Sequence, residues 1–399
     1  MIHRLTIENF YSFKEPTEIS FEVPQNAGQE DIYRTEDDGS RLNLVAAIFG
    51  PNASGKTNLL KAIGFLHWFI CRSANQKPGE HIWGAESFAF SRPLRRGCEL
   101  ALEFSLGGRL YRYRLRSTGE RVLHESLHVR KVRFNFVFER TWNPKKKDYD
   151  AKFQDFGDHA RLPLRENASV ISTAVLQENH LAMVLTKYFE GFYGNIGLFG
   201  RTDQHDPEPS KLYQAARYFE ENAKIFAALK SQLRAADFGL AEINLGRFSF
   251  IVPQGKEEEF TIPIARYEVA GEKYDMPLIH ESHGTQALFM VLRHILPVLE
   301  AGGVAYIDEL ESSLHPHLIR EIVRMFYSRR TNPKQAQLVF TCHSDYLLTE
   351  LKKYQIILVE KDPSLVSRAW RLDQMQGIRA SENIHAKYHA GAYGAIPDL

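Results

Sequence analysis

The sequence has few cysteines, no excess of either charge and no long apolar run. Its three cysteines, Cys71, Cys98 and Cys342, form no CxxC pair, which argues against structural zinc and a disulfide framework and fits a reducing compartment. Lys and Arg number 50 and Asp and Glu 49, so the chain as a whole attracts neither nucleic acid nor cations. It has no run of about 18 apolar residues and no signal-peptide core at its start. We therefore expect a soluble, cytoplasmic protein without a membrane partner.

A glycine-rich segment, Gly50-Pro-Asn-Ala-Ser-Gly-Lys-Thr57, follows an apolar run and precedes a helix-like run. This pattern is typical of a phosphate-binding loop, whose backbone N–H groups point at phosphate oxygens. We expect Gly50 and Gly55 where a Cβ would obstruct the phosphate, Lys56 on the β- and γ-phosphates, and the Thr57 hydroxyl on Mg²⁺. The predicted nucleotide-binding residues of the loop are Gly50, Asn52, Ser54, Gly55, Lys56, Thr57 and Asn58.

A second motif places two acids at the end of an apolar strand, Gly303-Val-Ala-Tyr-Ile-Asp-Glu309. In a parallel sheet, this position lies beside a phosphate-binding loop. Asp308 is then expected to hold Mg²⁺ through water, and Glu309 to polarise the water that attacks the γ-phosphate. The alternative is a plain solvated strand end, which the presence of the phosphate-binding loop makes the weaker interpretation.

Two further segments are candidates for phosphate contacts. His343 ends the strand that follows the acid pair, where it would sense the γ-phosphate; taken alone, a structural histidine is the alternative. Ser282-His-Gly-Thr-Gln286 opens a predicted helix, and its serine, its glycine and the helix N-terminus make a second anion site, with an ordinary helix N-cap as the alternative.

The remaining pattern predicts an α/β protein. Alternating residues predict a strand pair over residues 1–21 and an antiparallel β lobe that includes strands at 100–106, 110–115, 122–129 and 135–142. Strands and helices then alternate from residue 285 to 359, which predicts a mostly parallel sheet. Between these parts, residues 179–238 have a helical pattern, with Leu212, Phe219, Phe226 and Leu233 spaced by seven. This stripe either packs on its own domain or forms a surface for a second copy or a partner.

The order of these motifs resembles that of the ABC-type ATPase heads of the SMC, RecF and OLD families. The start Ile7-Glu-Asn-Phe-Tyr-Ser-Phe-Lys14 and the phosphate-binding loop are similar to theirs, and so are Ser312-Ser-Leu-His-Pro316 and the His343 segment. Within that group, the short insertion and the ending Tyr388-His-Ala-Gly-Ala-Tyr-Gly-Ala-Ile-Pro397 resemble the AAA-type ATPases of bacterial phage-defence and abortive-infection systems, the RloA and AbiL kind.

The resemblance implies a site shared between two copies of the chain. Two heads pair in opposed orientation, so Ser282 and Gly284 of one copy close over the γ-phosphate bound by Lys56 of the other. Both residues belong to the signature motif of these heads, Ser282-His-Gly-Thr-Gln286, which also contains Thr285. His283 and Thr285 depart from the Leu-Ser-Gly-Gly-Gln form that this motif has in transporters. The resemblance also implies a glutamine that senses Mg²⁺ and the attacking water, for which Gln177 is the candidate, with a surface glutamine as the alternative.

The resemblance further divides the chain into three parts and implies ATP and Mg²⁺ as cofactors. Residues 1–178 form an N-terminal ATPase lobe with the phosphate-binding loop and a β subdomain. Residues 179–240 form a helical insertion. Residues 241–399 form a C-terminal ATPase lobe with the signature, the acid pair and the switch histidine. The fold class is thus an α/β, ABC-type P-loop ATPase head with a mostly parallel core sheet, an antiparallel β lobe and a short helical insertion.

Two functions follow from the resemblance. The first is an ATP-hydrolysing subunit of an anti-phage defence complex, a homodimer or higher oligomer that controls a separate effector, a Toprim-like nuclease. The alternative is a RecF- or SMC-like DNA-binding ATPase of repair or recombination, which would use basic clusters near the β lobe. A solvated loop is the simpler interpretation of these clusters. His385 and His389 suggest a metal site, but no acid or cysteine motif accompanies them, so Mg²⁺ is the only metal predicted. The basic clusters are Arg92 with Arg95 and Arg96, Arg130 to Arg133, and Lys145 to Lys147.

Overall fold

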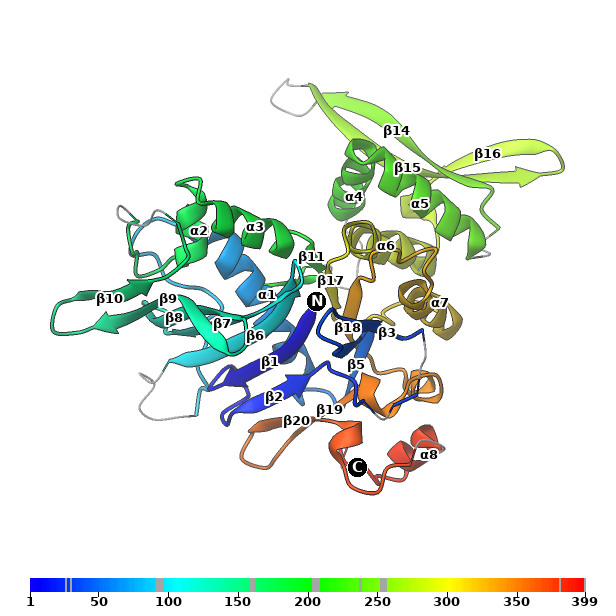
Figure 1. Cartoon of the computed structure of the whole chain (residues 1–399). Helices are drawn as coiled ribbons and strands as arrows, with labels where there is room; N and C mark the ends of the chain where they lie inside the picture. Colours follow the sequence, from blue (N-terminus) through cyan, green and yellow to red (C-terminus); the bar gives the residue numbers. More distant parts are fainter. Residues whose placement is uncertain are drawn as a thin grey trace.

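Two β-sheets with a helix between them form the centre of the computed structural model (Figure 1). The structure describes residues 1–25, 27–28, 31–90, 97–157, 162–202, 209–236, 239–251, 257–379 and 382–397. The predicted basic cluster of Arg92, Arg95 and Arg96 lies outside these residues.

The first sheet has seven strands and is antiparallel throughout, in the order β10-β9-β8-β7-β6-β1-β2. Its alternating sequence explains it: Leu100, Leu102 and Phe104 of β6 are fully buried, and the residues between them face the other side of the strand. The predicted N-terminal strand pair and β lobe are one continuous sheet, because β1 pairs with β6. The strands are β1 (Ile2–Glu8), β2 (Thr17–Ser20), β6 (Cys98–Leu106), β7 (Arg109–Ser117), β8 (Val122–Arg130), β9 (Phe134–Asn143) and β10 (Asp148–Phe153).

The second sheet has six strands in the order β11-β17-β18-β5-β19-β20, and only the edge strand β20 is antiparallel. All five residues of β5 are buried: Ala46 and Ile48 face one core, and Val45, Ala47 and Phe49 face the other. A strand covered on both faces is expected in a parallel sheet. The α/β prediction is therefore confirmed. The strands are β5 (Val45–Phe49), β11 (Phe192–Gly194), β17 (Val304–Ile307), β18 (Gln337–Thr341), β19 (Ile356–Lys361) and β20 (Ser367–Arg371).

Helices cover both faces of the parallel sheet. The helix α1 (Lys56–Arg72) packs its apolar side between the two sheets, in one core with Leu5 of β1 and Ile48 of β5. The opposite face is covered by α6 (His283–Ala301) and α7 (Pro316–Tyr327). Smaller elements are α2 (Val170–Val175), α3 (His180–Phe189), α8 (Ile384–His389), the hairpin of β3 (Tyr33–Thr35) and β4 (Arg41–Asn43), and the 3₁₀ helices η1 (Ser73–Asn75), η3 (Leu278–His280), η4 (Asp345–Thr349), η5 (Lys353–Gln355) and η6 (Leu372–Gln374).

The stretch predicted as helical, residues 179–238, departs from that prediction in its middle. It contains β11, which joins the parallel sheet, and a small hairpin of β12 (Ile196–Gly197) and β13 (Gly200–Arg201). Strands of two or three residues are too short to produce a recognisable alternation. The division at 179 and 240 stays a prediction.

The seven-residue stripe lies on two helices, α4 (Pro209–Glu221) and α5 (Ala223–Ala235), which meet at Asn222. Leu212, Phe219 and Leu233 are buried in the same core as α6. The stripe therefore packs on its own chain, as one of the two alternatives predicted. Beyond these helices extends an antiparallel sheet of β14 (Glu242–Ile251), β15 (Glu257–Val269) and β16 (Glu272–Pro277), drawn in yellow-green in Figure 1.

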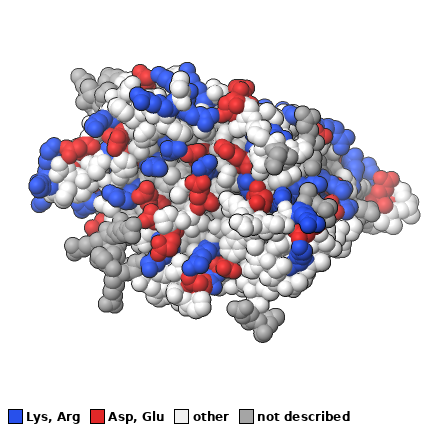
Figure 2. Space-filling model, turned by 60° about the horizontal axis from the view of Figure 1, so that its bottom comes forward, with Lys and Arg blue, Asp and Glu red and all other residues white. Residues whose placement is uncertain are grey.

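The distribution of surface charge and the length of the apolar helices complete the description. Basic and acidic side chains are interspersed over the face shown in Figure 2. Among the residues that the structure describes, no helix is both long enough and apolar enough to cross a membrane.

Candidate active site

The carboxyl ends of three neighbouring parallel strands bring the predicted site residues together. The phosphate-binding loop follows β5, Asp308 and Glu309 follow β17, and His343 closely follows β18, the strand between them. Ile307 pairs with Phe340, and Thr341 pairs with Ile48, so the three strands end at nearly the same level. Ligands bind at this edge in open α/β sheets.

The phosphate-binding loop curls around the side chain of its own lysine. Lys56 is 6% exposed, and its Nζ donates hydrogen bonds to the carbonyl oxygens of Gly50 and Pro51, each at 2.8 Å. Burial lowers the pKa of Lys56, and the nearby Asp308 and Glu311 carboxylates oppose that shift. The ammonium group of Lys56 thus lies within the loop, beside the acids that follow β17.

Contacts within the protein require glycine at both loop positions, and the expectation that these glycines clear space for phosphate stays a prediction. A Cβ on Gly50 would lie 2.0 Å from the carbonyl oxygen of Val359, and one on Gly55 2.5 Å from the Ser367 hydroxyl. Both also have positive φ, +153° and +115°, where an L side chain is strained. Packing against β19 and β20 therefore explains these glycines directly.

Two serine hydroxyls from outside the loop, those of Ser12 and Ser367, support it through hydrogen bonds that the sequence did not reveal. The Ser367 hydroxyl donates to the Ser54 carbonyl oxygen at 2.5 Å and lies 2.7 Å from the Ser12 hydroxyl. Asn58, predicted to bind nucleotide, donates its side-chain N–H to Ser12 at 2.8 Å. Ser12 and Ser367 lie far from the loop in the chain, so no local pattern links them to it.

Thr57 and Asp308 form the predicted Mg²⁺ pair. The Thr57 hydroxyl lies 3.2 and 3.0 Å from the two carboxylate oxygens of Asp308, and the Thr341 hydroxyl donates to one of them at 2.7 Å. Burial raises the pKa of Asp308, while the hydrogen bonds from Thr341 and Thr57 counteract that shift. A carboxylate and a hydroxyl are the hard oxygen ligands that Mg²⁺ prefers, so these residues fit the ion.

The loop also fits a phosphate group. The Ser54 hydroxyl is buried and has no hydrogen-bond partner among the described residues, and a buried polar group without a partner is costly. Ala53 has a φ of +61°, a conformation uncommon for alanine that keeps the tip of the loop turned. An anion that accepts hydrogen bonds would satisfy such a loop.

Asn195 fixes the peptide of Asp308, and the sequence analysis missed it. Its side-chain oxygen accepts the Asp308 N–H at 2.8 Å, and its side-chain N–H donates to the Asp308 carbonyl at 3.0 Å. Asn195 directly follows β11, the strand beside β17, and is 2% exposed. Because β11 lies inside the stretch predicted as helical, the sequence did not place Asn195 at the end of a strand.

Glu309 is held by three constraints. Its φ is +49°, its N–H donates to the Thr341 hydroxyl at 2.7 Å, and its carboxylate lies 2.5 Å from the guanidinium of Arg201. The Glu309 side chain is 33% exposed, so water can reach it. Arg201, in the β12–β13 hairpin, is a second residue that the sequence analysis missed. Both line a small cavity with His283 and Ser313.

The signature residues lie at the start of α6. Ser282 is exposed and caps this helix: its hydroxyl accepts the N–H of Thr285 at 3.3 Å and lies 2.9 Å from the Thr285 hydroxyl. Thr285 itself is buried. A Cβ on Gly284 would lie 3.3 Å from the Ser313 carbonyl, so the signature adjoins the loop after Glu309. In the described part of the chain, no hydrogen bond joins Ser282 to the phosphate-binding loop.

His343 and Gln177 have different positions. His343 is exposed, and its backbone N–H donates to the Glu311 carboxylate at 2.6 Å, so the residue lies at the edge formed by the acids. Gln177 is exposed in the turn after α2. Ser172 of α2 accepts the N–H of Ala74, just beyond the C-terminal end of α1, a helix about 25 Å long with Lys56 at its other end. The structure does not bring Gln177 to the site.

A phosphate-binding loop, a buried aspartate paired with its threonine, and a glutamate at the same sheet edge define the class of P-loop ATPases. The sequence profile of the family described as "AAA domain, putative AbiEii toxin, Type IV TA system" matches residues 45–349. The chain belongs to this family of AAA-type ATPases, whose members normally bind ATP with Mg²⁺.

One relative adds a local similarity. The DNA replication and repair protein RecF of Moorella thermoacetica (strain ATCC 39073 / JCM 9320) is 56% identical over 43 residues. The match covers 10% of this chain and 11% of the RecF protein. The chain thus spans a small part of that relative's length.

Proposed function

We propose that the chain hydrolyses ATP between two copies of itself, and that this pairing controls a separate effector. The observation that carries the proposal is the position of Ser282, exposed at the N-terminus of a 19-residue helix. Such a terminus attracts anions, yet no described hydrogen bond joins it to the phosphate-binding loop of the same chain. A second copy in opposed orientation would bring a phosphate to it.

The chemistry follows from the residues at the sheet edge. Lys56 neutralises charge on the transferred phosphoryl group, and Thr57 and Asp308 hold Mg²⁺, which stabilises that charge when it is bound. Glu309 accepts the proton of the attacking water. Arg201 orients the Glu309 carboxylate, and Asn195 fixes the peptide that carries Asp308. His343 contacts the γ-phosphate side of the site.

The biological role rests on family likeness. The family description names a toxin system, and the resemblance to RloA- and AbiL-type ATPases supports a role in anti-phage defence. In that role, ATP closes the pair, hydrolysis opens it, and the assembly restrains or releases a Toprim-type nuclease encoded separately.

The test is sedimentation velocity of the full chain with ATP and Mg²⁺. Glu309→Gln should lower turnover by about 10²- to 10⁴-fold while keeping ATP binding, so that a dimer accumulates. Adding Ser282→Arg to this variant should abolish the dimer and keep nucleotide binding, because the new side chain blocks the facing site.

Ser231→Arg is the matched control, since Ser231 is an exposed serine on α5, and Lys56→Ala should lose nucleotide binding. A Glu309→Gln protein that stays monomeric with ATP bound would contradict the shared site. So would a dimer that tolerates Ser282→Arg.

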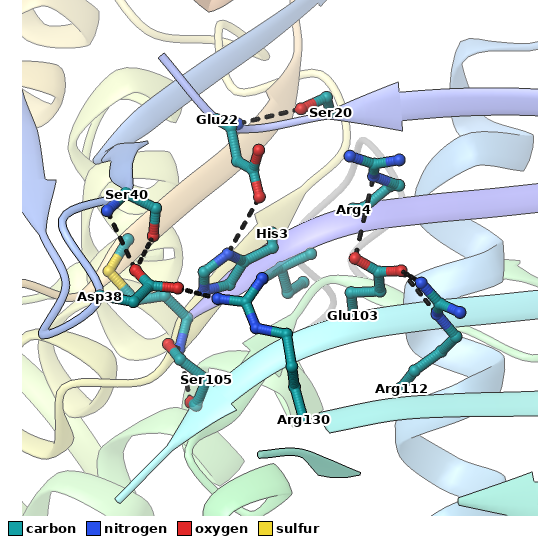
Figure 3. Close-up of polar contacts among 12 residues, drawn as sticks. His3, Arg4, Ser20, Glu22, Asp38, Ser40, Glu103, Ser105, Arg112 and Arg130 are labelled. Atoms are coloured by element: carbon teal, nitrogen blue, oxygen red, sulfur yellow. Dashed lines mark hydrogen bonds and ion pairs between the residues drawn. The ribbon is translucent and has the colours of Figure 1, made fainter. Parts of the chain in front are cut away.

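A DNA-binding ATPase is the second candidate, favoured by basic side chains on the outer face of β7. Arg114 and Arg116 are exposed there, and the local RecF similarity points the same way. Figure 3 shows the opposing feature: Glu103 pairs with Arg112 at 2.6 Å, and Asp38 pairs with Arg130. Part of the basic charge is therefore already neutralised within the chain.

A further inference from the structure

Three side chains of metal-binding type meet outside the nucleotide site. His385 and His389 lie four residues apart on α8, so they share one face of the helix. Asp345, the first residue of η4, faces them. One ligand atom from each residue lies within 4.8 Å of the other two. The sequence analysis found no acid beside the histidines because folding supplies it from a distant segment.

The separations suit a small cation after minor side-chain movement. His389 Nε2 lies 2.5 Å from one carboxylate oxygen of Asp345, and His385 Nε2 lies 3.9 Å from the other. Tetrahedral ligands at 2.0–2.1 Å from zinc are about 3.3 Å from one another, between these two values. The side chains are 35%, 54% and 41% exposed for His385, His389 and Asp345, so they have room to adjust.

We propose that Asp345, His385 and His389 bind one divalent transition-metal cation, with Zn²⁺ as the probe. Two imidazole nitrogens and one carboxylate oxygen suit zinc and its neighbours, whereas Mg²⁺ prefers oxygen ligands alone. Three protein ligands leave a fourth position for water or another group. The competing explanation is an ion pair between Asp345 and His389 without any metal.

The cation would join the C-terminal segment to the ATPase core. None of the six residues of α8 is buried, and this segment is otherwise attached by contacts such as the hydrogen bond from the Ala395 N–H to the Glu360 carboxylate at 3.3 Å. Asp345 lies two residues after His343. The metal therefore fixes the start of η4, close to the switch histidine, and attaches α8 to it.

The test is calorimetric titration of Zn²⁺ into the tag-free full chain with Mg²⁺ in excess. The chain should bind one Zn²⁺, and His385→Ala, His389→Ala and Asp345→Ala should each weaken that binding by at least about tenfold. His180→Ala, which removes an exposed histidine at the start of α3, should leave it unchanged. Asp308→Asn should also retain the binding, which separates this site from the Mg²⁺ site.

Thermal unfolding gives an independent result. Zn²⁺ should raise the melting temperature of the wild-type chain and not that of the double variant His385→Ala/His389→Ala, whose metal-free melting temperature should match the wild type because both side chains are at least a third exposed. Absence of Zn²⁺ binding, or equal affinity in the double variant, would mean that the cluster is an ion pair only.

Discussion

Arg201 is the residue whose contact most affects the proposed chemistry, because it holds the carboxylate of Glu309 at 2.5 Å. The Arg201 side chain is 13% exposed, so the arginine is largely shielded from solvent, while the Glu309 side chain, 33% exposed, stays open to water. A base that must meet one water molecule gains from a fixed orientation. We infer that Arg201 positions Glu309 and does not itself contact the reacting atoms.

We expect Arg201→Ala to lower kcat for ATP hydrolysis by about 10²-fold, the cost of misplacing a reacting group by roughly 1 Å. The KM for ATP should change little, and Arg201→Lys should restore part of the rate. Steady-state kinetics measures both, with Arg217→Ala as the control, since Arg217 forms an exposed pair on α4. An Arg201→Ala enzyme with unchanged or faster turnover would mean that the arginine restrains Glu309.

At the scale of single residues, the sequence predicts those site residues that lie within a short motif. Lys56 and Thr57, and Asp308 and Glu309, follow from local spacing after an apolar strand, and the structure brings these two pairs together. Asn195, Arg201 and Ser367 contact the site only through tertiary structure, so no spacing identifies them. Gln177 is predicted only from its place before the insertion, and α2, which it follows, contacts the chain just beyond the far end of α1 from Lys56.

Among the elements, α2 and the β lobe are joined by a buried ion pair. Glu125 of β8 and Arg140 of β9 are 0% and 1% exposed and lie 2.6 Å apart. The Glu125 carboxylate also accepts the Ser169 hydroxyl and the Val170 N–H at the start of α2. Arg140 donates to the carbonyl of Arg165 at 2.8 Å. The pair thus orients α2 against the antiparallel sheet.

Arg140→Met should destabilise the chain by about 3–5 kcal/mol, because it leaves the Glu125 charge buried without its partner. Urea unfolding followed by circular dichroism measures the change. Lys146→Met is the control: Lys146 pairs with Asp150 on the surface, and its loss should leave stability nearly unchanged. Equal stability of the two variants would refute this role for Arg140.

The elements most accurately predicted are those whose apolar residues follow an unbroken pattern along the sequence. The hairpin of β6 and β7 and the strand β17 were expected from alternation and from an apolar run, and the structure has them. Other elements were missed for physical reasons. The three residues of β11 carry no period, and the exposed strand β16 has few apolar residues to alternate.

For the whole molecule, the second candidate function requires that the basic charge on the antiparallel sheet binds DNA. If it does, replacing Arg114 and Arg116 by alanine should weaken binding in the presence of ATP and lower the salt slope by about 0.9 for each phosphate that the variant leaves unneutralised. Fluorescence anisotropy with labelled duplex at several salt concentrations measures this, with Arg217→Ala as the control. DNA binding that is the same with and without both arginines would exclude this surface as the DNA-binding site.

How the two sheets share one helix was not predictable from periodicity. The pairing of β1 with β6, and of β11 with β17, joins segments far apart in the chain, and no local pattern specifies such partners. The α/β class followed from the alternation of strands and helices near the C-terminus, since that pattern alone requires a parallel sheet.

The hydroxyl contacts beneath the phosphate-binding loop have a consequence for synthesis. Ser367 supports the loop from 313 residues further along the chain, and Asp308 also arrives late. At about 5–20 residues per second, a ribosome needs about 15 to 60 s to travel from the loop to Ser367. During that time, a nascent chain carries Lys56 without the groups that shape its site. We therefore expect nucleotide binding to begin only after Ser367 has been synthesised, and a chain that stops before Ser367 to bind nucleotide poorly.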